Sequence, residues 1–243
     1  MTTLSRIAIG FILAFLATSC GFDINIADFG TGVKGSGDIV TDTRKVTDDF
    51  TEISTSEGIQ VYITQSKDFK IKVEADSNII DLIGTDIKDG KLRIHAIENI
   101  GRATKKVYVT LPAITALKSS SGSHLDAEGT IHTDKLKIDS SSGSGIEIEV
   151  VVDELDIDAS SGANLNISGK TNMLNVDGSS GANINTKGLQ SKICDADASS
   201  GSNIAVNVSD RLTADASSGG NIAYAGDPTV KKNKSVSGSV HQY

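Results

Sequence analysis

One stretch of the sequence resembles a reactive site. It lies at residues 158–167, reads DASSGANLNI, and places two serines and a glycine beside a carboxylate. Nucleophilic catalysis by serine needs a hydroxyl beside a base that a third group orients. The phrase recurs as DGSSGANINT, DASSGSNIAV and DASSGGNIAY, whereas the histidines do not recur with it; they are His95, His124, His132 and His241. A catalytic serine would be unique, so we interpret these serines as turn residues and expect no catalytic residue and no enzyme activity.

The aspartates near each Ser-Gly step are the second candidate for chemistry. They occupy equivalent positions in successive repeats, at Asp139, Asp158, Asp177, Asp197 and Asp215. Stacked repeats would bring these carboxylates together, so solvent, serine hydroxyls or a hard cation such as Ca²⁺ must relieve their repulsion. We favour the simpler alternative, in which each aspartate caps its own turn. The nonapeptide calcium pattern of other β-rolls is absent. We therefore expect a surface ladder open to a cation or a partner, and assign no metal and no cofactor.

The spacing of the Ser-Gly steps indicates the elements that position these residues. The glycines recur every 18 to 21 residues, at 122, 143, 162, 181, 201, 219 and 238. Alternating apolar and polar residues flank each step, which predicts strands joined by Gly/Asn/Ser turns. A unit of about 19 residues cannot bury its own apolar face, so the units must stack in parallel, about 4.8 Å apart. The sequence predicts an all-β, right-handed parallel β-helix or β-solenoid of about 19-residue coils.

The alternation also assigns each side chain to a face. In the unit at 155–167, Leu155, Ile157, Ala159, Ala163 and Leu165 share one parity and are expected inside. The second serine of each step has the same parity, so we expect an inner serine ladder. The asparagines have the opposite parity and predict an outer amide ladder. The turn and ladder residues expected on this basis are Ser161, Gly162, Asn164, Ser180, Gly181, Asn183, Ser200, Gly201, Asn203, Ser218, Gly219 and Asn221.

The repeats divide the chain into regions. Residues 46–240 are expected to form the solenoid, with irregular first coils over 46–118 and regular Ser-Ser-Gly repeats over 119–240. A capping insertion is expected near 76–95, with a hairpin turn at Asp89 and Gly90. The formal net charge of −8 and the lack of a basic stripe argue against a nucleic-acid partner.

The N-terminus predicts export. Residues 1–19 contain Arg6, an apolar run over 7–16 that is too short to span a bilayer, and small residues before Cys20. This pattern predicts a lipoprotein signal peptide, with Cys20 lipidated and residues 20–45 forming a tether and first coil. An ordinary signal peptide with an incidental cysteine is the alternative. Lipidation would leave Cys194 unpaired, and its inward parity predicts an inert core thiol.

Several motifs occur together in a characteristic order. ATSC is followed by FTEISTSEGIQVYIT, IKVEADSNIIDLI, DGKLRI, VYVTLPAITALKSSSGS and serial SSG units that end in VSGSV. From residue 46 to 240 this order resembles the head GIN domain family, whose members are described as putative auto-transporter adhesins. The resemblance implies a β-helical fold and a bacterial cell-envelope location. It supplies no catalytic or binding residue.

Two functions follow as hypotheses. The first is a non-catalytic envelope lipoprotein, on the periplasmic or surface side of the outer membrane, that binds a surface protein or polysaccharide. The alternative is a polysaccharide-cleaving β-helix enzyme, a lyase or a glycoside hydrolase. Such an enzyme would need a deep cleft with an unrepeated acid/base pair.

Overall fold

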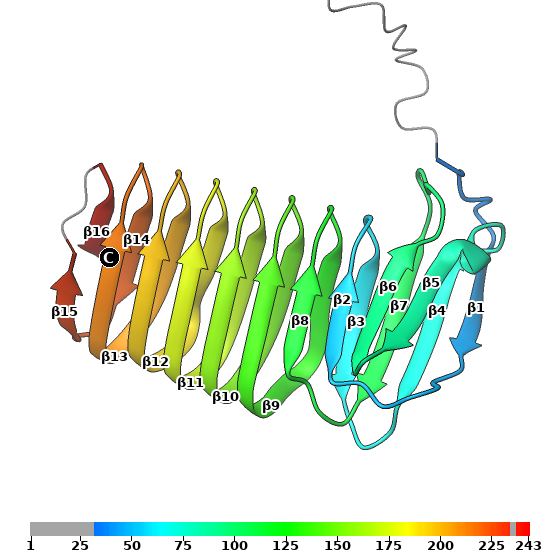
Figure 1. Ribbon diagram of the computed structural model, residues 1–243, viewed down its shortest axis with the longest axis horizontal. Coiled ribbons are helices and arrows are strands. Elements are labelled where there is room, and N and C mark those ends of the chain that lie inside the picture. The colour runs from blue at the N-terminus through cyan, green and yellow to red at the C-terminus, as the bar shows by residue number, and fades with distance from the viewer. Residues whose placement is uncertain (1–31, 234–236) are drawn as a thin grey trace, which may run out of the picture.

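The computed structural model describes residues 32–233 and 237–243, and it confirms a β-solenoid wound in a right-handed sense (Figure 1). The expected signal peptide and Cys20 lie outside these residues. The strands are β1 (Ile39–Arg44), β2 (Glu52–Thr55), β3 (Gln60–Gln65), β4 (Lys70–Asp76), β5 (Ile83–Lys88), β6 (Lys91–Ala96), β7 (Lys105–Leu111), β8 (Ala116–Ser119), β9 (His124–Ser140), β10 (Gly145–Ala159), β11 (Asn164–Gly178), β12 (Asn183–Ala198), β13 (Asn203–Ala216), β14 (Asn221–Ala225), β15 (Thr229–Lys232) and β16 (Ser239–Gln242). No helix among the described residues is long and apolar enough to span a bilayer.

Each of the long strands β9–β13 runs down one face, around a bend and up the other face. Successive strands pair in parallel, and Gly145, Asn164 and Asn183 are register partners, which gives a coil of 19 residues. We call the face that carries Asp158 the aspartate face and the face that carries Asn164 the asparagine face. The Ser-Gly turns join the two faces at one edge, and the bends join them at the opposite edge (Figure 1).

The core is a set of apolar columns between the two faces. One column contains Leu155, Leu174, Cys194 and Leu212, which are direct register partners and at most 1% exposed. Fully burying one such leucine contributes about 1.5–3 kcal/mol, and the columns repeat this gain in every coil. The absence of Trp and the low aromatic content fit this interior, which is only two β-layers thick.

Each Ser-Gly step forms a tight turn with two left-handed residues. In one turn Ser161 has φ 52° and Gly162 has φ 73°, and the Ala163 N–H donates to the Ser160 carbonyl at 3.1 Å. Positive φ at both central residues defines a type I′ turn. A Cβ on Gly162 would meet no atom within 4 Å, so glycine is needed there for its backbone conformation rather than for space.

The expected inner ladder of second serines is wrong. Ser142, Ser161, Ser180, Ser200 and Ser218 are all exposed. The two left-handed turn residues interrupt the strand alternation, so the second serine points out from the tip and the inward parity resumes one residue after the glycine. The inner polar positions are instead the flanking ones. There Ser140 Oγ and Ser144 Oγ lie 2.9 Å apart, both buried.

The N-terminal end of the solenoid is closed by antiparallel strands. On the asparagine face, β4 pairs antiparallel with β7, and β1 pairs with β4. On the aspartate face, β5 pairs antiparallel with β6 through the expected hairpin at Asp89 and Gly90. A short 3₁₀ turn at Ile80–Leu82 connects the two sides. The capping insertion near 76–95 is therefore present, and β1 and β4 extend it on the second face.

The first coils do not stack in chain order. The coil made by β6 and β7 lies between the cap and the coil made by β2 and β3, because β7 pairs with both β4 and β3. The strands β3 and β4 are consecutive in the chain, yet β7 separates them. The sequence predicted irregular first coils here, and the alternation did not specify which strands would be neighbours.

Candidate binding surfaces

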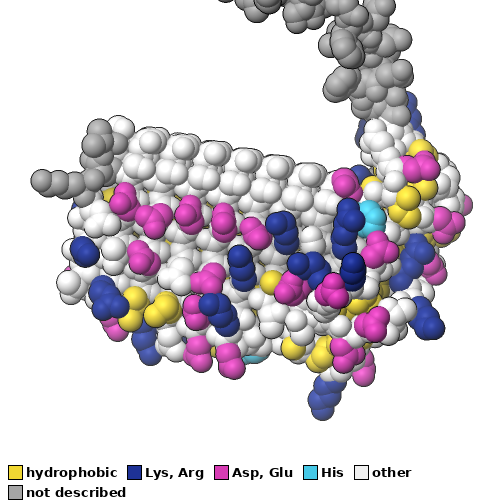
Figure 2. Space-filling view, in the orientation of Figure 1, with side chains coloured by type: hydrophobic (Ala, Val, Ile, Leu, Met, Phe, Trp, Pro, Cys, Tyr) yellow, Lys and Arg dark blue, Asp and Glu magenta, His cyan; other side chains and the backbone are white. Residues whose placement is uncertain are grey.

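The five aspartates form one column on the aspartate face. Asp139, Asp158, Asp177, Asp197 and Asp215 are direct register partners in successive coils. Figure 2 shows the row of acidic side chains below the tips of the Ser-Gly turns. At its N-terminal end Lys118 Nζ lies 3.6 Å from Asp139 Oδ2. The alignment predicted from the repeat is therefore the alignment that the structure has.

The expected capping of each turn by its own aspartate is not observed. Within residues 32–233 and 237–243, none of these five carboxylates accepts a hydrogen bond from its turn. The turn N–H groups are already used between coils, since Ser160 N–H donates to Ser140 O at 3.0 Å and Gly162 N–H donates to Ser180 O at 3.1 Å. The carboxylates point outward from the sheet, away from these donors.

Partial burial and, after it, the neighbouring aspartates raise the pKa values of the central carboxyls. Partial desolvation, followed by the charge of Asp158, raises the pKa of Asp177. Desolvation and three neighbouring aspartates, Asp195 foremost, raise the pKa of Asp197. Both carboxyls would ionise more easily in the unfolded chain, so the column opposes folding at neutral pH.

A second column on the same face shows how such repulsion is relieved. Asn175 lies between Asp156 and Asp195 in register and donates to Asp156 Oδ1 at 2.7 Å. Lys135 Nζ lies 3.0 Å from Asp156 Oδ2. Although partial desolvation opposes them, these two hydrogen bonds hold the pKa of Asp156 below its usual value. The five-aspartate column contains no such amide.

The asparagine face carries two amide columns. Asn183 Nδ2 donates to Asn164 Oδ1 at 3.3 Å, and Asn203 Nδ2 donates to Asn183 Oδ1 at 3.3 Å. Asn221 continues this column in register. In the next column, Asn185 Nδ2 donates to Asn166 Oδ1 at 3.2 Å. These amides bond coil to coil, so we interpret them as structural.

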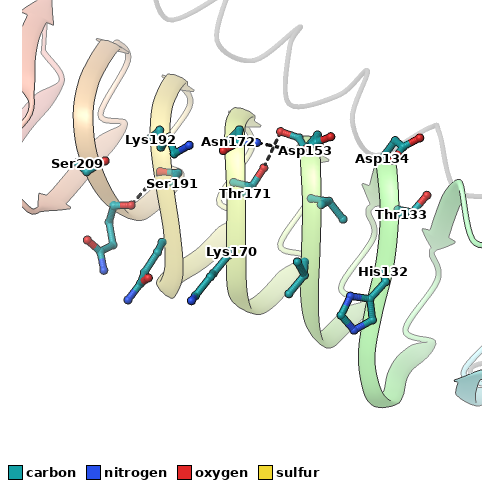
Figure 3. A pocket seen from close by; sticks show the side chains of 14 residues that line it. His132, Thr133, Asp134, Asp153, Lys170, Thr171, Asn172, Ser191, Lys192 and Ser209 are labelled. Carbon is teal, nitrogen blue, oxygen red and sulfur yellow. Dashed lines mark hydrogen bonds between the residues drawn. The ribbon is translucent and has the colours of Figure 1, made fainter.

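A groove runs along the bends, where sequence reasoning placed no site. Its volume is about 810 Å³, and it is lined by His132, Thr133, Asp134, Val151, Val152, Asp153, Lys170, Thr171, Asn172, Gln190, Ser191, Lys192, Asn207 and Ser209. Figure 3 shows His132 and Lys170 on one side, Asp153 and Asn172 on the other, and Thr171 and Ser191 between them. The groove crosses five coils, so it is about 19 Å long at about 4.8 Å per coil.

The groove columns break the repeat. One column reads His132, Val151, Lys170, Gln190 and Asn207 in register, so each coil presents a different side chain. The turn columns, in contrast, repeat serine and glycine. This loss of repetition at the bends was the sequence signal that could have indicated the groove.

Hydrogen bonds fix the floor of the groove and leave its cations free. Thr171 Oγ1 donates to Met173 O at 2.9 Å, and Ser191 Oγ donates to Asn207 O at 2.8 Å. Asn172 Nδ2 donates to Asp153 Oδ1 at 2.8 Å. Among the described residues, Lys170 and Lys192 form no ion pair. The groove therefore offers two uncommitted ammonium groups beside a pre-ordered polar floor.

The histidines and the described cysteine do not form a nucleophilic site. Cys194 is 1% exposed and unpaired, and burial raises the pKa of its thiol far above the usual value. His124 contacts Asp126 and His95 contacts Asp86, at 3.2 and 3.5 Å. The exposed His241 Nδ1 lies 3.5 Å from Ser239 Oγ, but among the described residues no carboxylate pairs with this imidazole to orient it. The buried serine hydroxyls bond to other serines and to backbone carbonyls.

The sequence of the solenoid matches a known family. Residues 49–228 match the sequence profile described as "Putative auto-transporter adhesin, head GIN domain". The chain belongs to this family. No curated protein sequence matches the chain.

Solved structures share the fold. A putative adhesin from Bacteroides fragilis superposes with a TM-score of 0.79 at 21% identity, over 87% of this chain and 100% of that one. A putative adhesin from Parabacteroides merdae gives 0.75 at 23% identity, over 87% and 98%. A putative lipid binding protein from Parabacteroides distasonis gives 0.68 at 17% identity, over 87% and 99%. Membership of an adhesin family points to a cell-envelope or surface protein.

Proposed function

We propose that the protein is a non-catalytic adhesion protein of the bacterial cell envelope, and that the groove along the bends binds an extended acidic polysaccharide. The observation that supports this most directly is the groove itself, which crosses five coils and presents a different side chain in each. A rigid row of side chains that differ from coil to coil suits a polymer that lies along the axis of the solenoid. The proposal assigns no cofactor to this activity.

The chemistry of the groove favours a glycan over a peptide. An extended peptide binds a sheet by pairing with an unpaired edge strand. In the groove, β10, β11 and β12 each pair with a neighbour on both sides, so no edge is available. The hydroxyl, amide and ammonium groups that line the groove instead suit the hydroxyls and carboxylates of an acidic sugar. Two carboxylates also line it, and one of them, on Asp153, already accepts a hydrogen bond from Asn172. The ammonium groups of Lys170 and Lys192 would bind the carboxylates of the polysaccharide.

The test is a glycan array followed by calorimetry on the best glycan. Changing both lysines (Lys170→Ala with Lys192→Ala) should weaken binding about tenfold or more, and raising the salt concentration should weaken binding to the unchanged protein. Lys88→Ala, in the cap hairpin, is the matched control and should leave affinity unchanged. Equal losses in both variants, or no binding to any acidic glycan, would contradict the proposal. Cleavage of a glycan that one groove substitution abolishes would favour the enzyme hypothesis.

The lipid anchor is a separate part of the proposal. A lipid on Cys20 would hold the protein at the membrane and leave the solenoid free to reach its partner. The N-terminal sequence supports this, since small residues follow an apolar run and precede Cys20. Cys20→Ser should move the protein from the membrane fraction to the soluble fraction. Retention of the variant in the membrane would refute the anchor and leave the groove proposal intact.

A further inference from the structure

Three metal-ligating side chains lie together on the asparagine face, where the irregular coils meet the regular ones. His124 and Asp126 come from β9, and Glu147 comes from β10. One ligand atom from each lies within 4.8 Å of the other two. Asp126 and Glu147 are direct register partners, and His124 is two residues from Asp126 on the same strand, so all three side chains point from one face.

A departure from the repeat makes room for the imidazole. Gly145 is the register partner of His124 and occupies the column that holds Asn164 and Asn183 in the next coils. A Cβ on Gly145 would collide with the ring of His124. Its φ is not in the left-handed region, so the backbone does not require glycine there. Glycine at this position therefore lets the ring lie across the neighbouring coil.

The distances suit a small divalent ion. His124 Nε2 lies 3.2 Å from Asp126 Oδ1. Two ligands at 2.0–2.2 Å in tetrahedral geometry are about 3.3 Å apart. Glu147 is exposed, and the weak 3.5 Å hydrogen bond from Asn166 Nδ2 to its Oε1 leaves its carboxylate free to turn toward the other two ligands.

The surrounding charges also favour a cation. On the other side of Asp126 its register partner is Tyr62, which stacks on Tyr108 at 5.2 Å and supplies no positive charge. Two neighbouring carboxylates with one imidazole carry more negative than positive charge, even when the imidazole is protonated.

We propose that His124, Asp126 and Glu147 form a binding site for one zinc-like divalent ion that links β9 to β10. One nitrogen and two oxygen ligands suit Zn²⁺ and the related first-row ions. Three protein ligands leave a fourth position open on the exposed face. Water, or a carboxylate or imidazole from a partner, would complete the coordination there.

The test uses Co²⁺ as a spectroscopic probe and Zn²⁺ as its competitor. Titration of the purified protein with Co²⁺ should produce visible absorption that saturates at one Co²⁺ per protein molecule. Addition of Zn²⁺ should abolish that absorption. His124→Asn and Glu147→Gln should each weaken Co²⁺ binding at least tenfold. His241→Asn, which alters an exposed histidine on β16 at the other end of the solenoid, should leave binding unchanged.

A fourth variant separates geometry from charge. Gly145→Asn keeps all three ligands but fills the space of the ring, so it should also weaken binding at least tenfold. Glu147 is exposed, so Glu147→Gln should fold and have the same circular dichroism as the parent. This variant therefore still tests the site if another variant misfolds. Absence of saturable Co²⁺ binding at concentrations up to about 100 µM would overturn the proposal. Equal loss in His241→Asn, or binding that survives all three site variants, would also overturn it.

Discussion

At the scale of single residues, the five-aspartate column is the feature that costs stability. Its carboxylates are aligned without an amide between them, while the neighbouring column has Asn175 hydrogen-bonded to Asp156. A single asparagine in the five-aspartate column would relieve part of this repulsion, as Asn175 does in the neighbouring column.

Asp177→Asn should stabilise the protein at neutral pH. The folded pKa of Asp177 is raised by desolvation and by Asp158, so ionisation favours the unfolded chain once the pH exceeds the unfolded pKa. Removing the charge should raise the free energy of unfolding by about 0.2–1 kcal/mol. Urea unfolding at pH 7 and at pH 3 measures this, and the gain should vanish at pH 3.

Asp156→Asn is the opposite case and the control. The folded pKa of Asp156 is lowered by Asn175 and Lys135, so its ionised form stabilises the fold above the unfolded pKa, and this contribution is lost as the pH falls through the folded value. The variant should be less stable than the parent at pH 7 and should approach it in acid. The same sign for both variants at pH 7 would refute this assignment of charge effects.

At the scale of elements, the type I′ turn sets the geometry of each coil. Its two left-handed residues reverse the chain sharply, and its N–H groups pair with the next turn, as Gly143 N–H does with Ser161 O at 3.0 Å. The backbone ladder thus continues around the edge, and each turn stabilises its neighbour.

Gly181→Ala should destabilise the protein by about 1–2 kcal/mol, because Gly181 has φ 74° and an L-residue pays for the left-handed region. Gly178→Ala is the matched control in the same coil. Its φ is not left-handed, and the equivalent positions in other coils hold Ala159, Ala198 and Ala216. A Cβ there would lie 3.2 Å from side-chain atoms of Ile204 and Ser202, which need to shift by only a few tenths of an ångström. Thermal unfolding should show a clear loss for Gly181→Ala and a much smaller change for Gly178→Ala. Equal losses would contradict the assignment of the Gly181 effect to its left-handed backbone conformation.

The sequence predicted the features that repeat from coil to coil, but it did not predict the features outside the repeat. The coil length and the aspartate column follow from residue spacing, because stacked parallel strands place equal offsets side by side. The position of Ser161 was wrong, since alternation says nothing about left-handed turn residues. The placement of β7 between β3 and β4 was also missed, because alternation assigns a strand's faces but not its neighbours. The groove was missed because its side chains differ from coil to coil, so only the loss of repetition at the bends marked its position.

At the scale of the whole molecule, the solenoid is modular. Asn164 and Asn183 are register partners, and the residues that precede them, Ala163 and Ala182, occupy equivalent buried positions. Removing one complete coil therefore joins equivalent points and lets β10 pair with β12 in the parent register. Stability in such arrays is close to a sum of coil and interface terms.

Deletion of residues 164–182 should give a folded protein that is about 4.8 Å shorter. Its circular dichroism per residue should match that of the parent, and X-ray scattering should show the shorter axis. The deletion also removes Lys170, so binding of the proposed glycan should weaken. Deletion of residues 164–173, about half a coil, is the control and should give an aggregated or unfolded chain. A misfolded full-coil deletion would contradict the modular description.

The placement of β7 between β3 and β4 has a consequence for biosynthesis. A ribosome releases β3 and β4 before β7 exists, and a short connection joins them. Two adjacent alternating strands can pair with each other as a hairpin at that stage. If β3 and β4 form such a hairpin, it must open before β7 can pair with both of them. The slowest part of maturation is therefore expected in the first coils, while the regular coils can add one by one as they emerge.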